Sequence, residues 1–412
     1  MTSVFDSKLF TAILGAKGIQ ILSQSITILL LIALANEKSV GQFDYYLALI
    51  STLTNISLWG QDSAISRSII DRKNMVEVVA NSAVIQLVQL CSTLLACLVV
   101  MRYLVAPLGI EPLHWMFLIL VVPACMSALA TENILNVCRW TGKNKEFMLA
   151  TIIGSVVPVI AVGAGFIVGQ SQGIILVFIH AFGRLLAVCT LVVILLRLKC
   201  SSFRKILINQ SWFRKKDLLR YSVPMGAGGF LLFSIPTIER LAIYSRLSFD
   251  GLAIWSISGR AMIAIDAICG SIAAMYFQTL HLNGRSDSPY LLRAAIKRYI
   301  MMASITAGLF WIIFFVLSEY NVFNLYVYKS AMFLLIPLSV SAVINGATVI
   351  LSSRLSVRGR AKPQLLLGFI FSSLYISCIM YVQWKGNLIY PACFYLAASL
   401  VRLFGTLHFV KN

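Results

Sequence analysis

Charged and amide side chains recur at helical spacing inside apolar stretches, and these residues of the sequence could bind an ion or a polar ligand. Two polar faces have this character: Lys17, Gln20 and Gln24 in residues 9–35, and Asp44, Asn55 and Asp62 in the stretch that begins at residue 41. Each set shares one face of a helix. Charged groups within apolar helices usually face a protein interior or water. The faces therefore predict a hydrated cavity, with hydrogen bonding between helices as the alternative.

A third polar face, in residues 330–352, carries no charge. Its members are Ser341, Asn345, Thr348 and Ser352. Serine, threonine and asparagine commonly join helices to one another inside a membrane. A cavity lining and helix-to-helix bonding are therefore equal interpretations of this face.

Residues 220–244 combine helix-bending residues with charge. Pro224 and Pro236 interrupt this stretch together with three glycines, and it also contains Glu239 and Arg240. Proline and glycine at membrane depth permit a bend and free backbone groups that need local partners. The pattern predicts a moving gate, with a static kink and an interfacial ion pair as the equal alternative.

Residues 250–277 hold one deep base and one acid. Arg260 and Asp266 are separated by about 240° around a helix of 3.6 residues per turn. Because they do not share a face, they need not pair within their own helix. Arg260 therefore remains a candidate for binding a ligand.

The composition sets the environment in which these helices lie. Of the 412 residues, 59% are hydrophobic and only 12% are charged, whereas soluble domains average about 25% charged residues. A helix needs about 20 residues to cross the hydrocarbon. By that measure we predict an all-α polytopic membrane protein with twelve spans: 9–35, 41–60, 79–101, 113–132, 147–169, 174–196, 220–244, 250–277, 299–318, 330–352, 364–384 and 388–408.

The distribution of basic residues predicts the orientation. Cytoplasmic loops carry an excess of Lys and Arg. If both termini are cytoplasmic, the inner segments hold 24 of the 34 basic residues and the outer segments hold five. We therefore predict a multi-pass protein with both ends in the cytoplasm. The net charge of +19 reflects this rule rather than binding to nucleic acid.

The same distribution predicts how the chain is divided. Residues 197–219 form a basic linker between a six-helix lobe of residues 1–196 and a second of residues 220–412. The segments that begin near Gly41 and Gly251 are weakly similar, and six spans in each half would relate the halves by an axis along the membrane normal.

Several motifs that would indicate an enzyme or a cofactor site are missing from the sequence. It contains no Walker lysine, no DxD pair, no GxSxG and no His/Cys cluster with metal-ligand spacing. We therefore expect no catalytic residue, no cofactor and no metal. The nine cysteines lie mostly in apolar segments and are interpreted as packing residues.

The chain resembles a bacterial polysaccharide flippase of the O-antigen type, in the multidrug/oligosaccharidyl-lipid/polysaccharide exporter superfamily. The resemblance rests on Gly15-Ala-Lys-Gly-Ile-Gln, Val40-Gly-Gln-Phe-Asp-Tyr-Tyr, Trp59-Gly-Gln-Asp-Ser-Ala-Ile-Ser-Arg, Tyr221-Ser-Val-Pro-Met, Glu239-Arg240-Leu and Phe249-Asp-Gly-Leu-Ala-Ile-Trp. It covers essentially the whole chain, although each motif is degenerate. The chain lacks the two additional C-terminal spans of the lipid II flippases, which disfavours that assignment.

The resemblance implies a MATE-like architecture and a substrate. The implied function is export of undecaprenyl-pyrophosphate-linked oligosaccharide across the inner membrane by alternating access, alongside a polysaccharide polymerase and a chain-length regulator. Lys17 and Arg260 match basic positions of the family's cationic cavity. The structural alternative is that each base neutralises a buried acid, with Asp62 and Asp266 as the candidates. A multidrug/cation antiporter is the nearest rival function, and a membrane-embedded polymerase or glycosyltransferase is the next.

Overall fold

The computed structural model describes residues 7–58, 82, 85–92, 94–95, 115–140, 144–197, 212–282, 289–357, 361–382 and 386–411. The side chains of Lys17 and of residues 212–231 lie outside this description. Asp62, most of the predicted span 79–101 and most of the basic linker also lie outside it.

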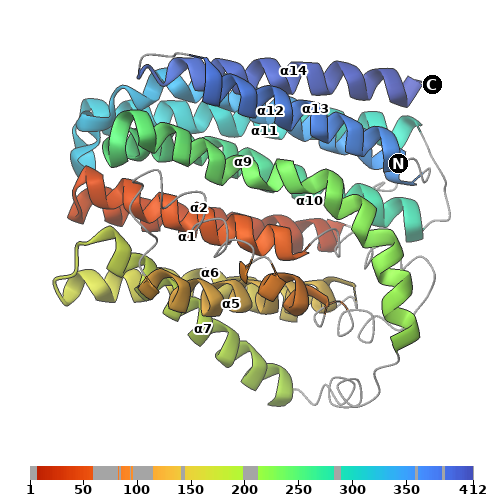
Figure 1. Cartoon of the computed structure of the whole chain (residues 1–412), viewed down its shortest axis with the longest axis horizontal. Helices are drawn as coiled ribbons and strands as arrows, with labels where there is room; N and C mark the ends of the chain where they lie inside the picture. Colours follow the sequence, from red (N-terminus) through yellow and green to blue (C-terminus); the bar gives the residue numbers. More distant parts are fainter. Residues whose placement is uncertain are drawn as a thin grey trace. The chain divides into compact units, whose positions relative to one another are not determined.

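The described chain is helical throughout its apolar stretches (Figure 1). The helices are α1 (Ser7–Leu34), α2 (Glu37–Leu58), α5 (Trp115–Trp140), α6 (Asn144–Ile167), α7 (Gly173–Arg197), α9 (Trp212–Ser258), α10 (Arg260–Leu282), α11 (Pro289–Glu319), the 3₁₀ helix η3 (Val322–Tyr328), α12 (Ala331–Val357), α13 (Ala361–Tyr381) and α14 (Ile389–Lys411). Each predicted span other than 79–101 and 250–277 falls on one of these helices, and 250–277 is shared between α9 and α10. The prediction of an all-α protein is confirmed.

Several of these helices can cross a membrane. Among the described residues, five are long and apolar enough: Lys145–Ile167, Gly173–Val192, Pro289–Glu319, Ala331–Ser352 and Ile389–Val410. The bent pair Ser234–Ser258 and Arg260–Ala273 is a sixth candidate. The chain is therefore a multi-pass membrane protein.

Contacts divide the chain into two compact units. The first unit contains Met1–Tyr45, Ser171–Ile174 and Thr237–Asn412, and the second contains Tyr46–Gln170 and Ile175–Pro236. Both units draw on segments from either side of the predicted linker. The two six-helix lobes stay a prediction.

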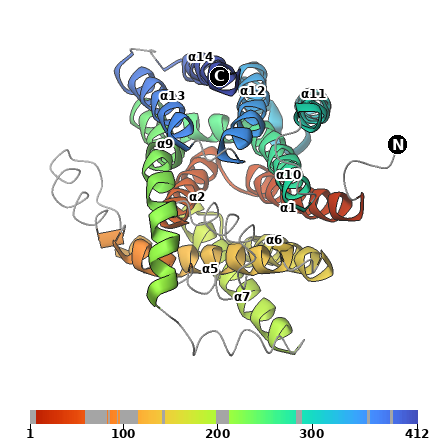
Figure 2. The same cartoon turned by 90° about the vertical axis from the view of Figure 1, so that its right-hand side faces the viewer.

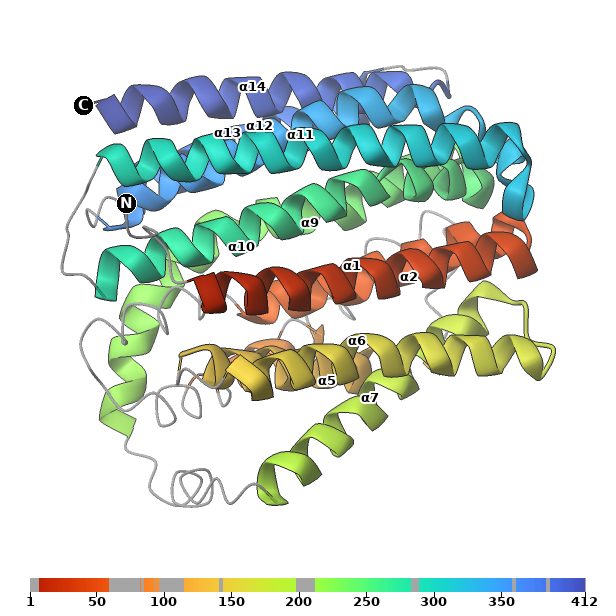
Figure 3. The ribbon, with the colours of Figure 1, turned by 180° about the vertical axis from the view of Figure 1, so that it is seen from behind.

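Helix α12 is the centre of the first unit. It packs against α10, α11, α13 and α14, and α1 packs against α10 (Figures 2 and 3). A large apolar cluster joins α10, α11, α12 and α14, and it includes the fully buried rings of Tyr276 and Tyr299. The Tyr299 hydroxyl donates to the carbonyl of Ala342 at 3.0 Å. This core holds α10, α11, α12 and α14 together within the first unit.

Two helix breaks lie beyond the stretch in which the sequence predicts a bend, and that bend stays a prediction. The backbone is helical through Pro224 and Pro236, and within α9 it leaves helical angles at Ser248, with φ 57° and ψ −163°. The predicted eighth span is then divided at Gly259, and the segments Ser234–Ser258 and Arg260–Ala273 on either side of it differ in direction by 41°. Such a φ is strained for a residue with a side chain. The described breaks therefore flank the segment 249–258.

The strained turn at Ser248 is held by its neighbours. Gly41 of α2 lies against the backbone of Phe249, and a Cβ at Gly41 would overlap the Phe249 carbonyl oxygen. Arg246 donates to the carbonyls of Ile379 and Met380, both at 2.8 Å, near the end of α13. Glycine at position 41 thus permits a close approach of α2 to this turn.

Tight packing at Gly346 gives a prediction about stability. A Cβ there would overlap the ring of Tyr299, and overpacking a core costs about 1–3 kcal/mol. We expect Gly346→Ala to lower the unfolding temperature of the purified protein in detergent, although alanine favours a helix.

Gly308 on α11 supplies the control, because a Cβ there meets no atom within 4 Å. Gly308→Ala should leave the unfolding temperature unchanged or raise it. Shortening the ring partner in Gly346→Ala/Tyr299→Leu should recover part of the loss. Equal unfolding temperatures for the two alanine variants would contradict the packing at Gly346.

Candidate functional site

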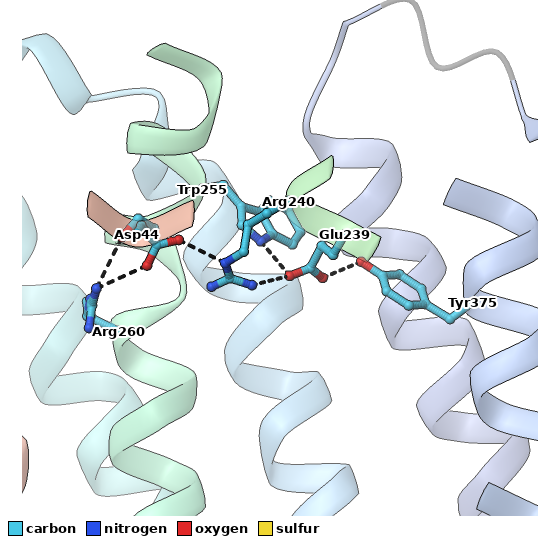
Figure 4. Close-up of polar contacts among 7 residues, drawn as sticks. Asp44, Glu239, Arg240, Trp255, Arg260 and Tyr375 are labelled. Atoms are coloured by element: carbon cyan, nitrogen blue, oxygen red, sulfur yellow. Dashed lines mark hydrogen bonds and ion pairs between the residues drawn. The ribbon is translucent and has the colours of Figure 1, made fainter. Parts of the chain in front are cut away.

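Asp44 lies between two arginines in the first unit (Figure 4). Arg240 donates from Nε to Oδ2 of Asp44 at 2.9 Å, and Arg260 donates from Nη2 to Oδ1 at 3.3 Å. Asp44 is 4% exposed. Its carboxylate therefore joins α2 to α9 and to α10 in a setting that excludes most water.

Glu239 forms the second acidic centre of the same cluster. It accepts from Nη1 of Arg240 at 2.9 Å, from Nε1 of Trp255 at 2.9 Å and from the hydroxyl of Tyr375. The side chain of Arg240 thus lies between the two carboxylates (Figure 4). We call Asp44, Glu239, Arg240 and Arg260 the ion-pair cluster.

The elements place these side chains near helix breaks. Asp44 follows the start of α2 at Glu37 by two turns, and Arg260 is the first residue of α10, after the break at Gly259. Trp255 is buried in an apolar cluster with Ile243, Leu252 and Leu338. The chain reverses its direction at Ser248, which brings Trp255 back to Glu239.

The cluster is electrically balanced. Two carboxylates face two guanidinium groups, and the arginine side chains are only 15% and 11% exposed. Burying charges is costly unless each is paired with good geometry, and removing one partner of a buried pair costs about 3–5 kcal/mol. The four residues are therefore expected to depend on one another.

Arg260 retains unused hydrogen-bonding capacity. Its Nη2 atom bonds both Asp44 and the hydroxyl of Ser256, at 3.3 and 3.2 Å. Its Nε atom is buried and has no hydrogen-bond partner among the described residues. An unpartnered buried donor is costly, so the Nε–H of Arg260 is available to a polar ligand. Guanidinium groups bind phosphate and carboxylate through two parallel donors.

The structure brings together four of the residues that the sequence singled out. Asp44 and Arg260 came from different polar faces, and Glu239 and Arg240 came from the predicted gate. Asp44 is buried in ion pairs rather than open to a cavity. The acid beside Arg260 is Asp44, whereas Asp266 is exposed and interacts electrostatically with Arg402.

Trp255 and Tyr375 are neighbours of Glu239 that sequence reasoning missed. Both donate to Glu239, from positions 16 and 136 residues away along the chain. No helical spacing links them to Glu239. An aromatic residue with a donor in an apolar helix is a general sign that an acceptor lies nearby, but it does not name the acceptor.

The other predicted polar residues have more local partners or lie outside the description. Asn55 donates to Ser51 at 3.5 Å within α2, and the Oε1 atom of Gln24 is buried without a partner among the described residues. Gln20 is partly buried on α1. The contacts of Lys17, Asp62 and Pro224 are not described. Contact with a substrate stays a prediction for all of them.

The uncharged face in α12 bonds mostly to its own helix. Ser341, Thr348 and Ser352 donate to carbonyls of their own helix, and Asn345 donates to Ser399 of α14 at 2.8 Å. The Asn345 bond supports the helix-to-helix interpretation for that residue, whereas the bonds of Ser341, Thr348 and Ser352 favour neither interpretation.

The sequence matches no protein-family model and no curated protein. The fold, by contrast, matches solved transporters. Inward-facing and outward-facing structures of a multidrug resistance MATE family transporter of the MOP superfamily both match with a TM-score of 0.64 and 16% identity, over 98% of this chain and 98% and 96% of theirs. A MOP superfamily transporter from Pyrococcus furiosus, described as having a binding pocket of reverse polarity, matches with a TM-score of 0.67 and 16% identity, over 98% of this chain and 94% of that one.

These similarities establish the architecture. The chain has the MATE-like transporter fold over nearly its whole length, as predicted from the sequence. At this identity the comparison extends to the fold alone. Because the two conformations match equally well, the comparison does not favour either state.

The ion-pair cluster predicts that replacing a glutamate by glutamine lowers the free energy of unfolding more at Glu239 than at Glu319. Glu239→Gln removes a charge that is 7% exposed and paired with Arg240, so we expect the free energy of unfolding to fall by about 3 kcal/mol. Glu319→Gln removes the acid of the exposed Lys329 pair. Exposed pairs contribute little, so this variant should unfold like the parent protein.

The measurement is thermal or denaturant unfolding of the purified protein in one detergent. A loss in Glu319→Gln as large as that in Glu239→Gln would contradict the buried ion-pair account. Tyr375→Phe removes one donor to Glu239. Its loss of stability should be smaller than that of Glu239→Gln and larger than that of Glu319→Gln.

Proposed function

We propose that this protein is an alternating-access transporter that moves a lipid-linked anionic oligosaccharide from the cytoplasmic to the outer leaflet of the inner membrane. The expected carrier is undecaprenyl pyrophosphate. The transporter fold supports the general activity, and the motif resemblance supports the substrate. The observation that carries the proposal is the buried Nε donor of Arg260, which has no partner among the described residues.

A pyrophosphate can use the donors of Arg260. It must lose water to enter a membrane protein, and a guanidinium edge replaces that water with two charge-assisted hydrogen bonds. Arg260 presents Nε and holds Asp44 at 3.3 Å, a longer contact than the 2.9 Å of Arg240. In the proposed mechanism the phosphate replaces Asp44 as the ion-pair partner of Arg260. Asp44 remains paired with Arg240.

This exchange of partners supplies a gate. Asp44 belongs to the first predicted lobe, and Arg240 and Arg260 belong to the second. Their ion pairs hold α2 against α9 and α10 near the turn at Ser248, which the basic-residue count predicts to be extracytoplasmic. Loss of the Arg260 contact weakens this closure. We propose that substrate binding thereby favours opening toward the outside.

The membrane potential can drive the step. Moving one charge across a potential of 100 mV changes the free energy by about 2.3 kcal/mol. The cytoplasm is negative, so outward movement of an anionic headgroup is favoured. With the predicted orientation, both termini lie in the cytoplasm, and the product is delivered to the side where a polysaccharide polymerase and its chain-length regulator would act.

A multidrug/cation antiporter is the second candidate. Asp266 is an exposed acid on α10, and the matched solved structures include a multidrug resistance transporter. A cation would be attracted to Asp266 rather than to Arg260. The two candidates therefore predict opposite sensitivities for these two positions.

Substitution of Arg260 tests the proposed substrate. We expect Arg260→Ala to lower flipping of a lipid-linked pyrophosphate oligosaccharide in proteoliposomes by tenfold or more. Arg260→Lys should recover only part of the activity, because lysine keeps the charge and loses the planar pair of donors. Asp266→Asn serves as the comparison and should retain flipping. Efflux of a cationic dye that is lost in Asp266→Asn and kept in Arg260→Ala would favour the antiporter.

A purely structural role for Arg260 predicts a different result. If Arg260 only neutralises Asp44, then Asp44→Asn/Arg260→Ala leaves the Glu239–Arg240 pair intact and should restore flipping. If Arg260 binds the headgroup, the double variant folds and stays inactive. Full recovery in the double variant would overturn the headgroup role.

A further inference from the structure

One face of α11 forms an open groove on the surface of the first unit. Its volume is about 520 Å³, and its described lining residues are Arg293, Ile296, Lys297, Ile300 and Met301. These positions recur every three to four residues and share one side of the helix. The surface of the groove is almost wholly apolar, so Arg293 and Lys297 line it with their aliphatic stems, beside three apolar side chains.

No described residue supplies a compensating charge to the two bases of the groove. Arg293 and Lys297 are exposed, and no described residue forms a hydrogen bond or ion pair with either side chain. Arg298, directly after Lys297, is a third base, and the sole acid of α11 is Glu319 at its opposite end. The bases at this end of α11 thus attract an anion.

The length of α11 places these bases at the level of lipid headgroups. With 31 residues and a rise of about 1.5 Å per residue, the helix is longer than the hydrocarbon thickness of about 30 Å. Its bases end at Arg298, and an uncharged stretch follows up to Glu319. Arg293 and Lys297 therefore lie where the helix leaves the hydrocarbon.

An apolar surface continues from the groove along the helix. Side chains that are 44–56% exposed follow one another toward the other end: Ile300, Met301, Ile305, Leu309, Ile312 and Ile313. Figure 3 shows α11 along its length on the outside of the first unit. A ligand with an anionic head and long hydrocarbon chains matches both parts of this surface.

We propose that the groove of Arg293 and Lys297 binds the phosphate of an anionic membrane phospholipid, whose acyl chains lie along Ile300, Met301 and Ile305. Basic pockets at the membrane surface recognise anionic headgroups in this way. The ligand is a lipid of the surrounding leaflet, and the site is separate from the ion-pair cluster. Its occupancy does not depend on the transported substrate.

The groove predicts selective binding of phosphatidylglycerol over phosphatidylcholine. We would titrate the full chain in detergent with each lipid and measure bound lipid by native mass spectrometry. Arg293→Gln/Lys297→Gln should raise the apparent Kd for phosphatidylglycerol about thirtyfold, which corresponds to about 1 kcal/mol per base. Its affinity for phosphatidylcholine should not change.

The matched control is Lys38→Gln/Lys329→Gln, which removes two exposed lysines outside the groove and the same net charge. It should bind phosphatidylglycerol like the parent chain. An equal loss of phosphatidylglycerol affinity in both double variants would show that only net charge matters, and would overturn the proposal. So would unchanged affinity in Arg293→Gln/Lys297→Gln, or a change of oligomeric state without a change in lipid binding.

The competing phosphate source is the carrier lipid itself. Undecaprenyl phosphate added at the same concentration as phosphatidylglycerol should displace little of it from the parent chain. Complete displacement would contradict a phospholipid site and assign the groove to the carrier.

Discussion

A carboxylate buried among apolar helices must be neutralised where it lies, and Asp44 imposes this constraint on the first unit. Its two arginine partners come from α9 and α10, so both helices must approach α2 closely. Gly41 permits that approach by leaving room for the carbonyl of Phe249. The strained angles at Ser248 and the break at Gly259 then direct the chain so that Arg240 and Arg260 face one acid.

This arrangement makes closure reversible in principle. Arg240 is held by two carboxylates, whereas Arg260 has one longer carboxylate contact and a buried unpaired Nε. An anion that engages Arg260 removes only part of the closure and leaves Arg240 paired. Loss of a partner without replacement is costly at such a site. The proposed transport cycle therefore couples ligand binding to opening through a single exchange of partners.

The fold was largely predictable from the sequence, because long apolar stretches in a membrane can satisfy their backbone only as helices. The four residues of the ion-pair cluster were predicted from the sequence, but which of them form ion pairs with one another was not. Helical spacing places Asp44 and Arg260 on polar faces, yet it carries no information about which helices meet. Trp255 and Tyr375 were missed for the same reason. The breaks at Ser248 and Gly259 were missed as well, because the close approach of Gly41 to Phe249 cannot be read from spacing along the chain.

Cross-linking between α2 and the turn of α9 tests the gate most directly. The rings of Tyr45 and Phe249 lie 6.3 Å apart, so in a cysteine-free background Tyr45→Cys/Phe249→Cys should react with a short rigid bis-maleimide. The link should stop flipping in proteoliposomes. The control pair Tyr244→Cys/Phe249→Cys, with rings 4.5 Å apart, ties α9 only to itself and should remain active after the same treatment. Undiminished flipping by fully linked Tyr45→Cys/Phe249→Cys would show that α2 and α9 need not separate there, and would contradict the gate.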